Sequence, residues 1–228
     1  MKKILKWLDN YWYHYKWVTI IVAVFSAILI FCIVNTGSGL QDDIQILYAG
    51  PEVLTDVQIE QMERSFADLL KKDYNGDGKK SVGIVNITIM SDEQLEAAQE
   101  QAELEGQTIV YDPTLRTKAI SQMKSMMGTG AVIICLLDPY VYECCEEGTF
   151  ITLEKALGEK VENSNDEFSL WFSQTSMYSL YDCFSLLSEQ TLLCIRNDVV
   201  ITSNNKHFQK EYAWHKTYFL DLVQYSVS

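Results

Sequence analysis

The chain has 228 residues, of which 48% are hydrophobic and 21% charged, and its formal net charge is −13. With only 3 prolines, this composition excludes an intrinsically disordered chain and predicts a folded one. The acidity argues against a nucleic-acid partner, because phosphate backbones are bound by clustered lysine and arginine. In the simplest interpretation the negative charge keeps the protein soluble, and in the alternative it attracts cations or basic ligands.

The first candidate element is an uncharged apolar stretch, residues 18–34, which reads VTIIVAVFSAILIFCIV. At 1.5 Å per residue, and with its aromatic flank, it is close to the ~30 Å needed to cross a bilayer as a helix. Tryptophans and tyrosines crowd residues 7–17, and such rings favour the headgroup region. We therefore predict one transmembrane helix over residues 18–34, with the lipid bilayer as its partner.

The lysine distribution predicts the orientation of this helix. Residues 1–34 hold four lysines and one aspartate, a net charge of +3, whereas the remainder holds 14 basic and 30 acidic residues, a net charge of −16. The positive-inside rule then places residues 1–17 in the cytoplasm as a basic and aromatic segment. Residues 35–42 are expected to form a tether, and residues 43–228 an extracytoplasmic domain.

Two alternatives to a permanent anchor are less favoured. A cleaved signal peptide has an apolar core of about 7–15 residues, and here the core is longer, with only a weak cleavage match at Thr36-Gly37-Ser38. A lipoprotein needs a small residue before its modified cysteine, but Phe31 precedes Cys32. We therefore expect the chain to stay anchored in the cell membrane.

Beyond the tether, apolar runs alternate with helical patterns. Thr55 and Gln58 form a capping-box pattern before one helix, Ser91 caps an acidic helix over 92–105, and Pro113 starts a helix ending at 128–130. Asp138-Pro139 opens a short helix, and Asn204 or Asn205 begins the last one. Strands are expected at residues 44–48, 82–89, 131–137, 168–173 and 191–196.

This alternation predicts an α/β domain with a mostly parallel sheet and helices on both faces. The runs 44–48, 82–89 and 131–137 are expected to be neighbouring central strands, since 131–137 is apolar throughout. In such a sheet, ligands tend to bind beyond the carboxyl ends of the strands. Those ends are residues 48–50, 90–92 and 137–138, and the ligand-binding residues themselves stay unknown.

The sharpest local motif is Asp73-Tyr-Asn75-Gly-Asp77-Gly78, which matches the first half of a calcium loop. Position 12 of such a loop should be a bidentate glutamate, but here it is Ile84, in a predicted strand. The alternative is an Asn/Asp/Gly-rich turn between helix and strand. We favour the turn, and keep Asp73, Asn75 and Asp77 as a candidate for weak calcium binding only.

No sequence signature for catalysis or for a cofactor stands out. The chain has no G-x-S-x-G, no H-E-x-x-H and no phosphate-binding glycine loop, and no CxxC pair supports a zinc site. His207 and His215 fall on the last predicted helix and are interpreted as solvated surface residues. Five cysteines follow the anchor, and their pairing stays open: Cys135, Cys144, Cys145, Cys183 and Cys194.

Two stretches resemble known families. Tyr13-His-Tyr-Lys-Trp17, running straight into the apolar span, resembles uncharacterised single-pass proteins of Gram-positive bacteria. The segment from Met126 through Asp138-Pro139 to Phe150-Ile-Thr-Leu is similar to one lobe of an extracellular solute-binding protein. That resemblance implies a βαβ lobe, but the chain is too short for a second full lobe, so it gives no binding residues.

The favoured function is therefore a non-enzymatic, membrane-anchored extracytoplasmic binding or interaction module, with a small-molecule or protein ligand outside the cell. The alternatives are a cell-surface enzyme with an unrecognised site, and an accessory or sensor subunit of a membrane complex. Absent nucleophile, metal and cofactor motifs favour binding over catalysis.

The predicted orientation can be tested directly. Protease added to intact cells or spheroplasts should digest the domain after residue 40, because that domain is expected outside. Immunoblotting against an epitope at each end of the chain gives the readout. Full protection of the domain in intact cells, with digestion only after lysis, would show that the predicted orientation is wrong.

Overall fold

A computed structural model describes residues 42–106, 113–161, 164–198 and 206–224. The predicted cytoplasmic segment and membrane helix, and the predicted tether up to residue 41, lie outside these residues. Within the described ranges, no helix combines the length and the apolar character that a membrane crossing requires. The described residues form one compact unit.

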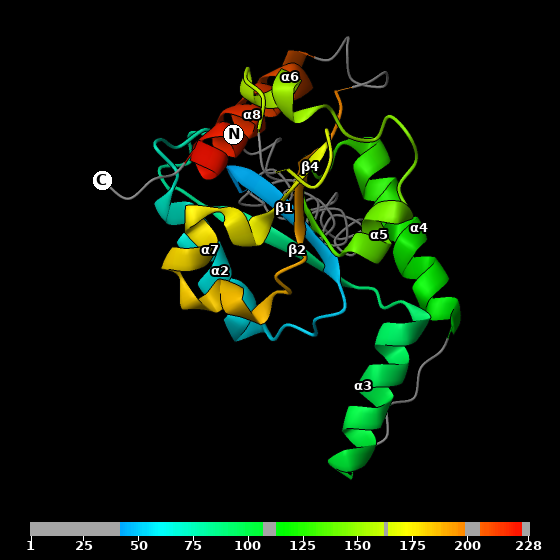
Figure 1. Ribbon diagram of the computed structural model, residues 1–228. Helices are drawn as coiled ribbons and strands as arrows, with labels where there is room; N and C mark the ends of the chain where they lie inside the picture. Colours follow the sequence, from blue (N-terminus) through cyan, green and yellow to red (C-terminus); the bar gives the residue numbers. More distant parts are fainter. Residues whose placement is uncertain (1–41, 107–112, 162–163, 199–205, 225–228) are drawn as a thin grey trace, which may run out of the picture. The chain divides into compact units, whose positions relative to one another are not determined.

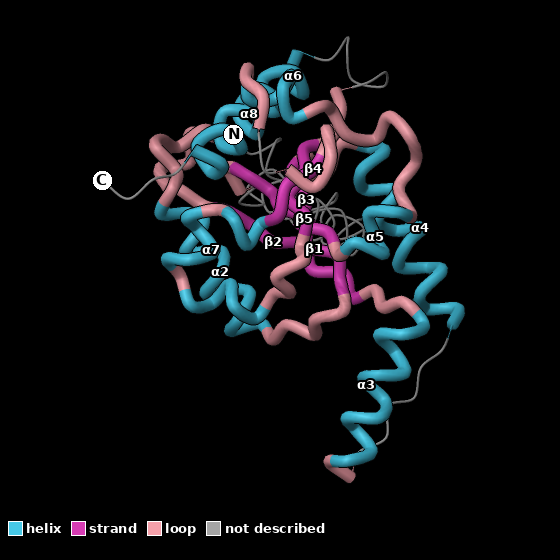
Figure 2. The backbone as a smooth tube through the Cα atoms, in the orientation of Figure 1, coloured by secondary structure: helices cyan, strands magenta, loops and turns pink. Residues whose placement is uncertain are grey.

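The described unit is a mixed α/β fold built on a five-stranded sheet, drawn in magenta in Figure 2. The strand order is β2-β1-β3-β5-β4. Strand β1 pairs in parallel with both β2 and β3, whereas β5 runs antiparallel to β3 and β4. The strand bounds are β1 (Ile44–Gly50), β2 (Val82–Thr88), β3 (Ile134–Leu137), β4 (Ser169–Trp171) and β5 (Leu192–Ile195).

The expected strands exist, but two features of their arrangement differ from the prediction. Strand β2 lies at an edge of the sheet instead of centrally, and two of the four pairings are antiparallel. Both antiparallel pairings involve β5, which lies between β3 and β4 and runs opposite to both, so the second difference comes from the direction of this one strand. Strand β3 also begins at Ile134, three residues later than expected.

Helices flank the strands and occupy the expected segments. The longer ones are α2 (Asp56–Asp68), α3 (Asp92–Leu104), α4 (Pro113–Thr129) and α8 (Lys206–Gln224). Residues 176–187, which the sequence leaves undecided, form α7 (Ser176–Leu180) and a 3₁₀ helix η2 (Asp182–Leu186). The short helices are α5 (Pro139–Glu143) and α6 (Leu153–Leu157), with one 3₁₀ turn, η1 (Phe172–Gln174).

The helix starts follow the predicted chemistry. The side chain of Thr55 accepts from the backbone N–H of Gln58, and the Gln58 side chain accepts from the backbone N–H of Thr55. Ser91 and Gln94 form the same reciprocal pair at the start of α3. The acidic face of α3 is solvated, as expected: Glu93, Glu96, Glu100 and Glu103 are all exposed.

Alternate residues of the strands feed two separate cores, one on each face of the sheet. Ile44, Ile46 and Tyr48 of β1 pack with α2, α6, α7 and α8. Leu47 and Ala49 pack on the opposite face with α4 and α5. Figure 1 shows the same layering, with α2 and α7 on one side of the strands and α4 and α5 on the other. The sheet is therefore covered on both faces, as the sequence predicted.

His215 is buried, which corrects its interpretation as a surface residue. It is 8% exposed, and its Nε2 accepts a hydrogen bond from the backbone N–H of Gln45 at 3.1 Å. Helical periodicity places it on the same face as Tyr218, Phe219 and Leu222, which are buried against the sheet. A histidine on an apolar face of a helix is turned inward with the rest of that face. The side chain of His207 lies outside the part of the chain that the structure describes.

Phe66 of α2 should be the most sensitive position in the larger core. It is 1% exposed and its ring lies 4.6 Å from the ring of Phe184, so Phe66→Ala leaves a large cavity and should cost about 3–5 kcal/mol. Val57 on the same helix is 63% exposed, and Val57→Ala should change stability by less than about 0.5 kcal/mol. Urea unfolding gives both values, and equal costs would contradict this core assignment.

Candidate functional site

The strand order predicts one privileged position for a ligand. The chain leaves β1 toward β2 on one side and leaves β3 toward β4 on the other, so the connections run in opposite directions at the boundary between β1 and β3. Ligands tend to bind at the carboxyl ends of the strands at such a switch point. Asp138 lies there, directly after β3, and is 5% exposed. One carboxylate oxygen accepts from the backbone N–H of Tyr140 and the other from the side-chain amide of Gln94, each at 2.9 Å.

Glu52 and Tyr48 lie at the end of β1 beside Asp138. The Tyr48 hydroxyl oxygen accepts from the backbone N–H of Glu52 at 3.3 Å. Burial raises the pKa of Tyr48 strongly, and burial, followed by the charge of Asp138, raises the pKa of Glu52. A half-buried carboxyl group whose pKa is raised beside a second carboxylate is a common feature of binding and catalytic sites, and also of structural polar clusters.

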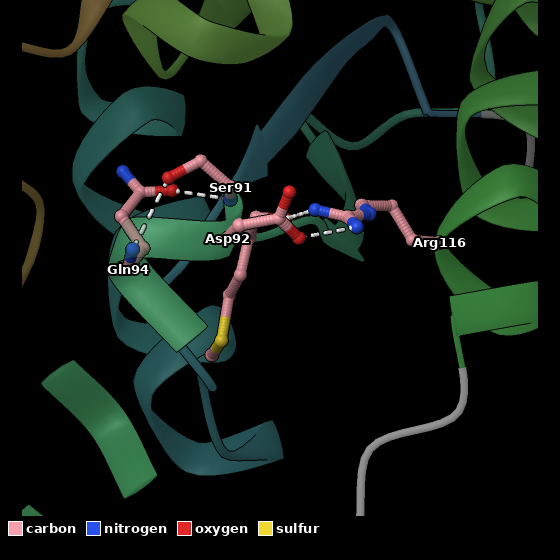
Figure 3. Close-up of polar contacts among 5 residues, drawn as sticks. Ser91, Asp92, Gln94 and Arg116 are labelled. Carbon is pink, nitrogen blue, oxygen red and sulfur yellow. Dashed lines mark hydrogen bonds and ion pairs between the residues drawn. The ribbon is translucent and has the colours of Figure 1, made fainter. Parts of the chain in front are cut away.

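Arg116 of α4 lies beside the start of α3 at this edge (Figure 3). Its guanidinium pairs with the carboxylate of Asp92 at 2.6 Å and donates to the carbonyl oxygen of Met90 at 3.3 Å. The Ser91–Gln94 capping box lies directly beside this pair. Arg116 thereby joins α4 to the start of α3, immediately after β2.

The structure thus brings together all three strand ends that the sequence singled out, at residues 48–50, 90–92 and 137–138. Their polar groups bind one another: Asp138 caps α5, Gln94 links Asp138 to the start of α3, and Arg116 ties α3 to α4. Hydrogen bonds thus link the segments that follow the three strands at this edge. Glu52 is a half-buried acidic group of the same edge.

The calcium-like motif folds as a turn whose oxygen atoms accept from the local backbone. The carboxylate of Asp73 accepts from the N–H groups of Gly76 and Gly78, at 2.6 and 2.8 Å. These bonds lower the pKa of Asp73, the one from Gly76 contributing most. Asn75 and Asp77 accept in the same way, each from the N–H two residues on. The three side chains therefore serve the turn, and Gly76 and Gly78 take the positive φ that it requires.

Asp43 holds the same turn from within the domain, a role that no local sequence pattern indicates. It is 2% exposed, and its carboxylate accepts from the N–H groups of Tyr74, Asn75 and Ser81, at 2.6, 2.8 and 3.1 Å. A buried carboxylate is stable when several backbone donors surround it. Asp43 thus fixes the turn to the start of β1.

A surface pocket of about 400 Å³ lies beyond α5, on the α4 and α5 face of the sheet. Its rings include Tyr142 and Phe150, which stack with centroids 5.4 Å apart. Four glutamates line it, Glu143, Glu146, Glu147 and Glu167, and all four are exposed. We call it the glutamate pocket; its full lining is Tyr142, Glu143, Cys145, Glu146, Glu147, Gly148, Thr149, Phe150, Glu167 and Phe168.

Asp166 holds two walls of the glutamate pocket in place. One of its oxygens accepts from the hydroxyl of Tyr142 at 2.8 Å, and the other accepts from the backbone N–H of Phe168 at 2.8 Å. Burial opposes the charge of Asp166, but hydrogen bonds from Ser169, Phe168 and Tyr142 outweigh it and lower the pKa of Asp166. The aromatic walls are therefore positioned before any ligand arrives.

The five cysteines of the described residues are all free thiols. Cys135 and Cys194 are buried and directly opposite each other on β3 and β5, as small core residues. Cys145 lines the glutamate pocket, and burial raises its pKa to about 12. A thiol with that pKa stays protonated and is a poor nucleophile at neutral pH.

Comparisons of this chain with protein-family models, with curated proteins and with solved structures found no match. Its function is therefore inferred from the geometry of its own residues. The sequence located the strand ends and the turn, but it did not locate the glutamate pocket. The four glutamates lie on two separate segments, and only the fold brings Glu167 to the other three.

Substitutions can measure separately what Asp43 and the turn residue Asp77 contribute to stability. Asp43→Ala removes a buried carboxylate that accepts from three partly buried backbone N–H groups, and should cost about 2–4 kcal/mol. Asp77→Ala removes one exposed bond and should have little effect on stability in chelator. Chemical denaturation with EDTA measures both.

Calcium titration calorimetry of the wild type and Asp77→Ala completes this test. We expect binding no tighter than about 10⁻⁴–10⁻³ M, because the oxygens are already used by the backbone and no glutamate stands at position 12. Micromolar binding that disappears in Asp77→Ala would show that the turn is a true calcium site.

Proposed function

We propose that this chain is a membrane-anchored extracytoplasmic binding module, and that its ligand is cationic and binds in the glutamate pocket. The observation that carries the proposal is the pocket itself, where four glutamates line a cavity of about 400 Å³ beside a stacked Tyr142–Phe150 pair. The anchor of residues 18–34 and the lysine asymmetry support the location.

The pocket's chemistry favours a positive charge carried on an organic group. Aromatic faces attract cations through the ring quadrupole, and carboxylates add a longer-range attraction. The net charge of −16 after residue 34 would also concentrate cations around the domain. A quaternary ammonium, a polyamine or the side chain of a lysine or arginine in a peptide has the required combination.

The pocket is better suited to binding than to covalent catalysis. Its thiol, Cys145, has a pKa near 12, and the Tyr142 hydroxyl is engaged with Asp166. The resemblance to one lobe of a solute-binding protein supports the same class of function. A single compact unit would hold its ligand on one surface, instead of closing two lobes around it.

A ligand screen on the full-length protein in detergent tests this proposal. Choline, spermidine and arginine amide should raise thermal stability, with about 2.7 kcal/mol gained at 100 times the dissociation constant. Neutral sugars and the neutral choline analogue 3,3-dimethylbutanol should have a much smaller effect. Glu143→Gln combined with Glu167→Gln should weaken binding of the active cation by about tenfold or more.

Glu100→Gln is the matched control, since Glu100 is an exposed glutamate on α3 and contributes nothing to the pocket lining. Equal weakening by the control would reduce the effect to general electrostatics. Stabilisation by neutral compounds alone would contradict a cationic ligand, and turnover of any compound would contradict a non-enzymatic role.

A further inference from the structure

Strand β1 contains one backbone donor, the N–H of Gln45, that finds no acceptor within the sheet. Strand β1 pairs with β2 along its full length, but its pairing with β3 starts only at Ile46. In a parallel strand the N–H groups alternate between the two neighbours. Ile44 donates toward β2, to the carbonyl of Ser81, so Gln45 donates toward β3, one residue before the pairing begins. His215 Nε2 supplies the missing acceptor at 3.1 Å.

This contact fixes the protonation state of His215. Its Nδ1 lies 2.9 Å from the carbonyl oxygen of Glu211, which can only accept, so Nδ1 carries the proton. Nε2 faces an N–H, so it must be unprotonated to accept. The positively charged ring would present an Nε2–H to the Gln45 N–H, and this hydrogen bond would become a repulsive contact.

The charged groups around this contact are engaged elsewhere. On α8, Lys216 donates to the carbonyl of Lys155 on α6, and Asp221 pairs with Lys71 after α2. Near the start of β1, the carboxylate of Asp43 is surrounded by backbone donors. Burial lowers the pKa of His215 to about 4, against a smaller opposite effect of the Glu211 carbonyl, and no charged side chain contributes.

Other contacts of α8 do not titrate near neutral pH. The Tyr218 hydroxyl donates to the carbonyl of Phe66 at 2.7 Å, and Phe219 and Leu222 are fully buried. Trp214 packs against Tyr74 in the turn held by Asp43, with ring centroids 5.4 Å apart. Among these contacts, the His215–Gln45 bond is the one that acid breaks between pH 6.5 and 4.

We propose that His215 is a pH-sensitive latch for the C-terminal helix: it holds α8 to β1 only while its ring is neutral, and acid loosens α8 ahead of the sheet. The sign follows from linkage. The pKa in the closed state is about 4 and the ordinary value is 6.5, so the stabilisation is complete above pH 6.5 and is lost as pH falls toward 4. At pH 5 these values make opening about 30-fold more favourable than at pH 7.5.

Hydrogen exchange with mass spectrometry on the full-length protein in detergent tests the latch. After correction for intrinsic exchange rates, the opening constant of α8 should rise about 30-fold from pH 7.5 to pH 5 and exceed that of β1 and β3. His215→Gln supplies a side-chain acceptor that does not titrate, and it should abolish most of this rise. Lys216→Gln, at the neighbouring position, is the control and should keep it.

Two results would overturn the proposal. One is an equal rise in His215→Gln, which would assign the pH dependence to other groups. The other is identical opening of α8 and the sheet at pH 5, which would show one cooperative unit without a latch. If His215→Gln does not fold, NMR titration of the wild-type ring decides: a pKa near 4 supports the latch, and one near 6.5 rejects it.

Discussion

Strand β1 (Ile44–Gly50) is paired along both edges and covered on both faces, so each of its polar backbone groups must find a partner inside the protein. Its partner β3 is shorter, four residues against seven. Side chains and loops therefore complete the hydrogen bonding where the ladder stops. His215 accepts from Gln45 at one end, and the N–H of Asp138 donates to the carbonyl of Ala49 at the other.

These two ends carry different parts of the molecule. At the start of β1, the Gln45–His215 hydrogen bond holds α8 against the strand. Asp43 binds the Asp73–Gly78 turn there, and Trp214 of α8 packs against Tyr74 of that turn. At the far end it fixes Asp138, whose carboxylate begins α5 and binds Gln94. The glutamate pocket lies just beyond α5, so the position of its walls depends on the same strand end.

The sequence predicted those elements whose signal is local. Thr55 with Gln58 and Ser91 with Gln94 form the capping boxes expected from residues three apart, and the apolar runs gave all five strands. Contacts between segments that lie far apart in the chain have no such local signal. Nothing in the order of residues shows that β2 lies at the edge, or that β5 returns antiparallel beside β3.

The same limit applies to the site. Asp43 and His215 are polar residues without a local pattern, and their roles depend on partners 31 and 170 residues away. Glu167 joins the other pocket glutamates only through folding. The turn residues Asp73, Asn75 and Asp77 were easier, because their hydrogen bonds run to backbone groups within five residues.

The dependence of the fold on completed hydrogen bonding of β1 can be observed directly through the Gln45–His215 contact. NMR of the uniformly ¹⁵N-labelled protein at neutral pH should show a scalar coupling between the amide nitrogen of Gln45 and Nε2 of His215, because the hydrogen bond joins these two atoms. The Nδ1 shift should be that of a protonated nitrogen, and the Nε2 shift that of an unprotonated one. A ring protonated on Nε2, with no coupling to Gln45, would contradict the account.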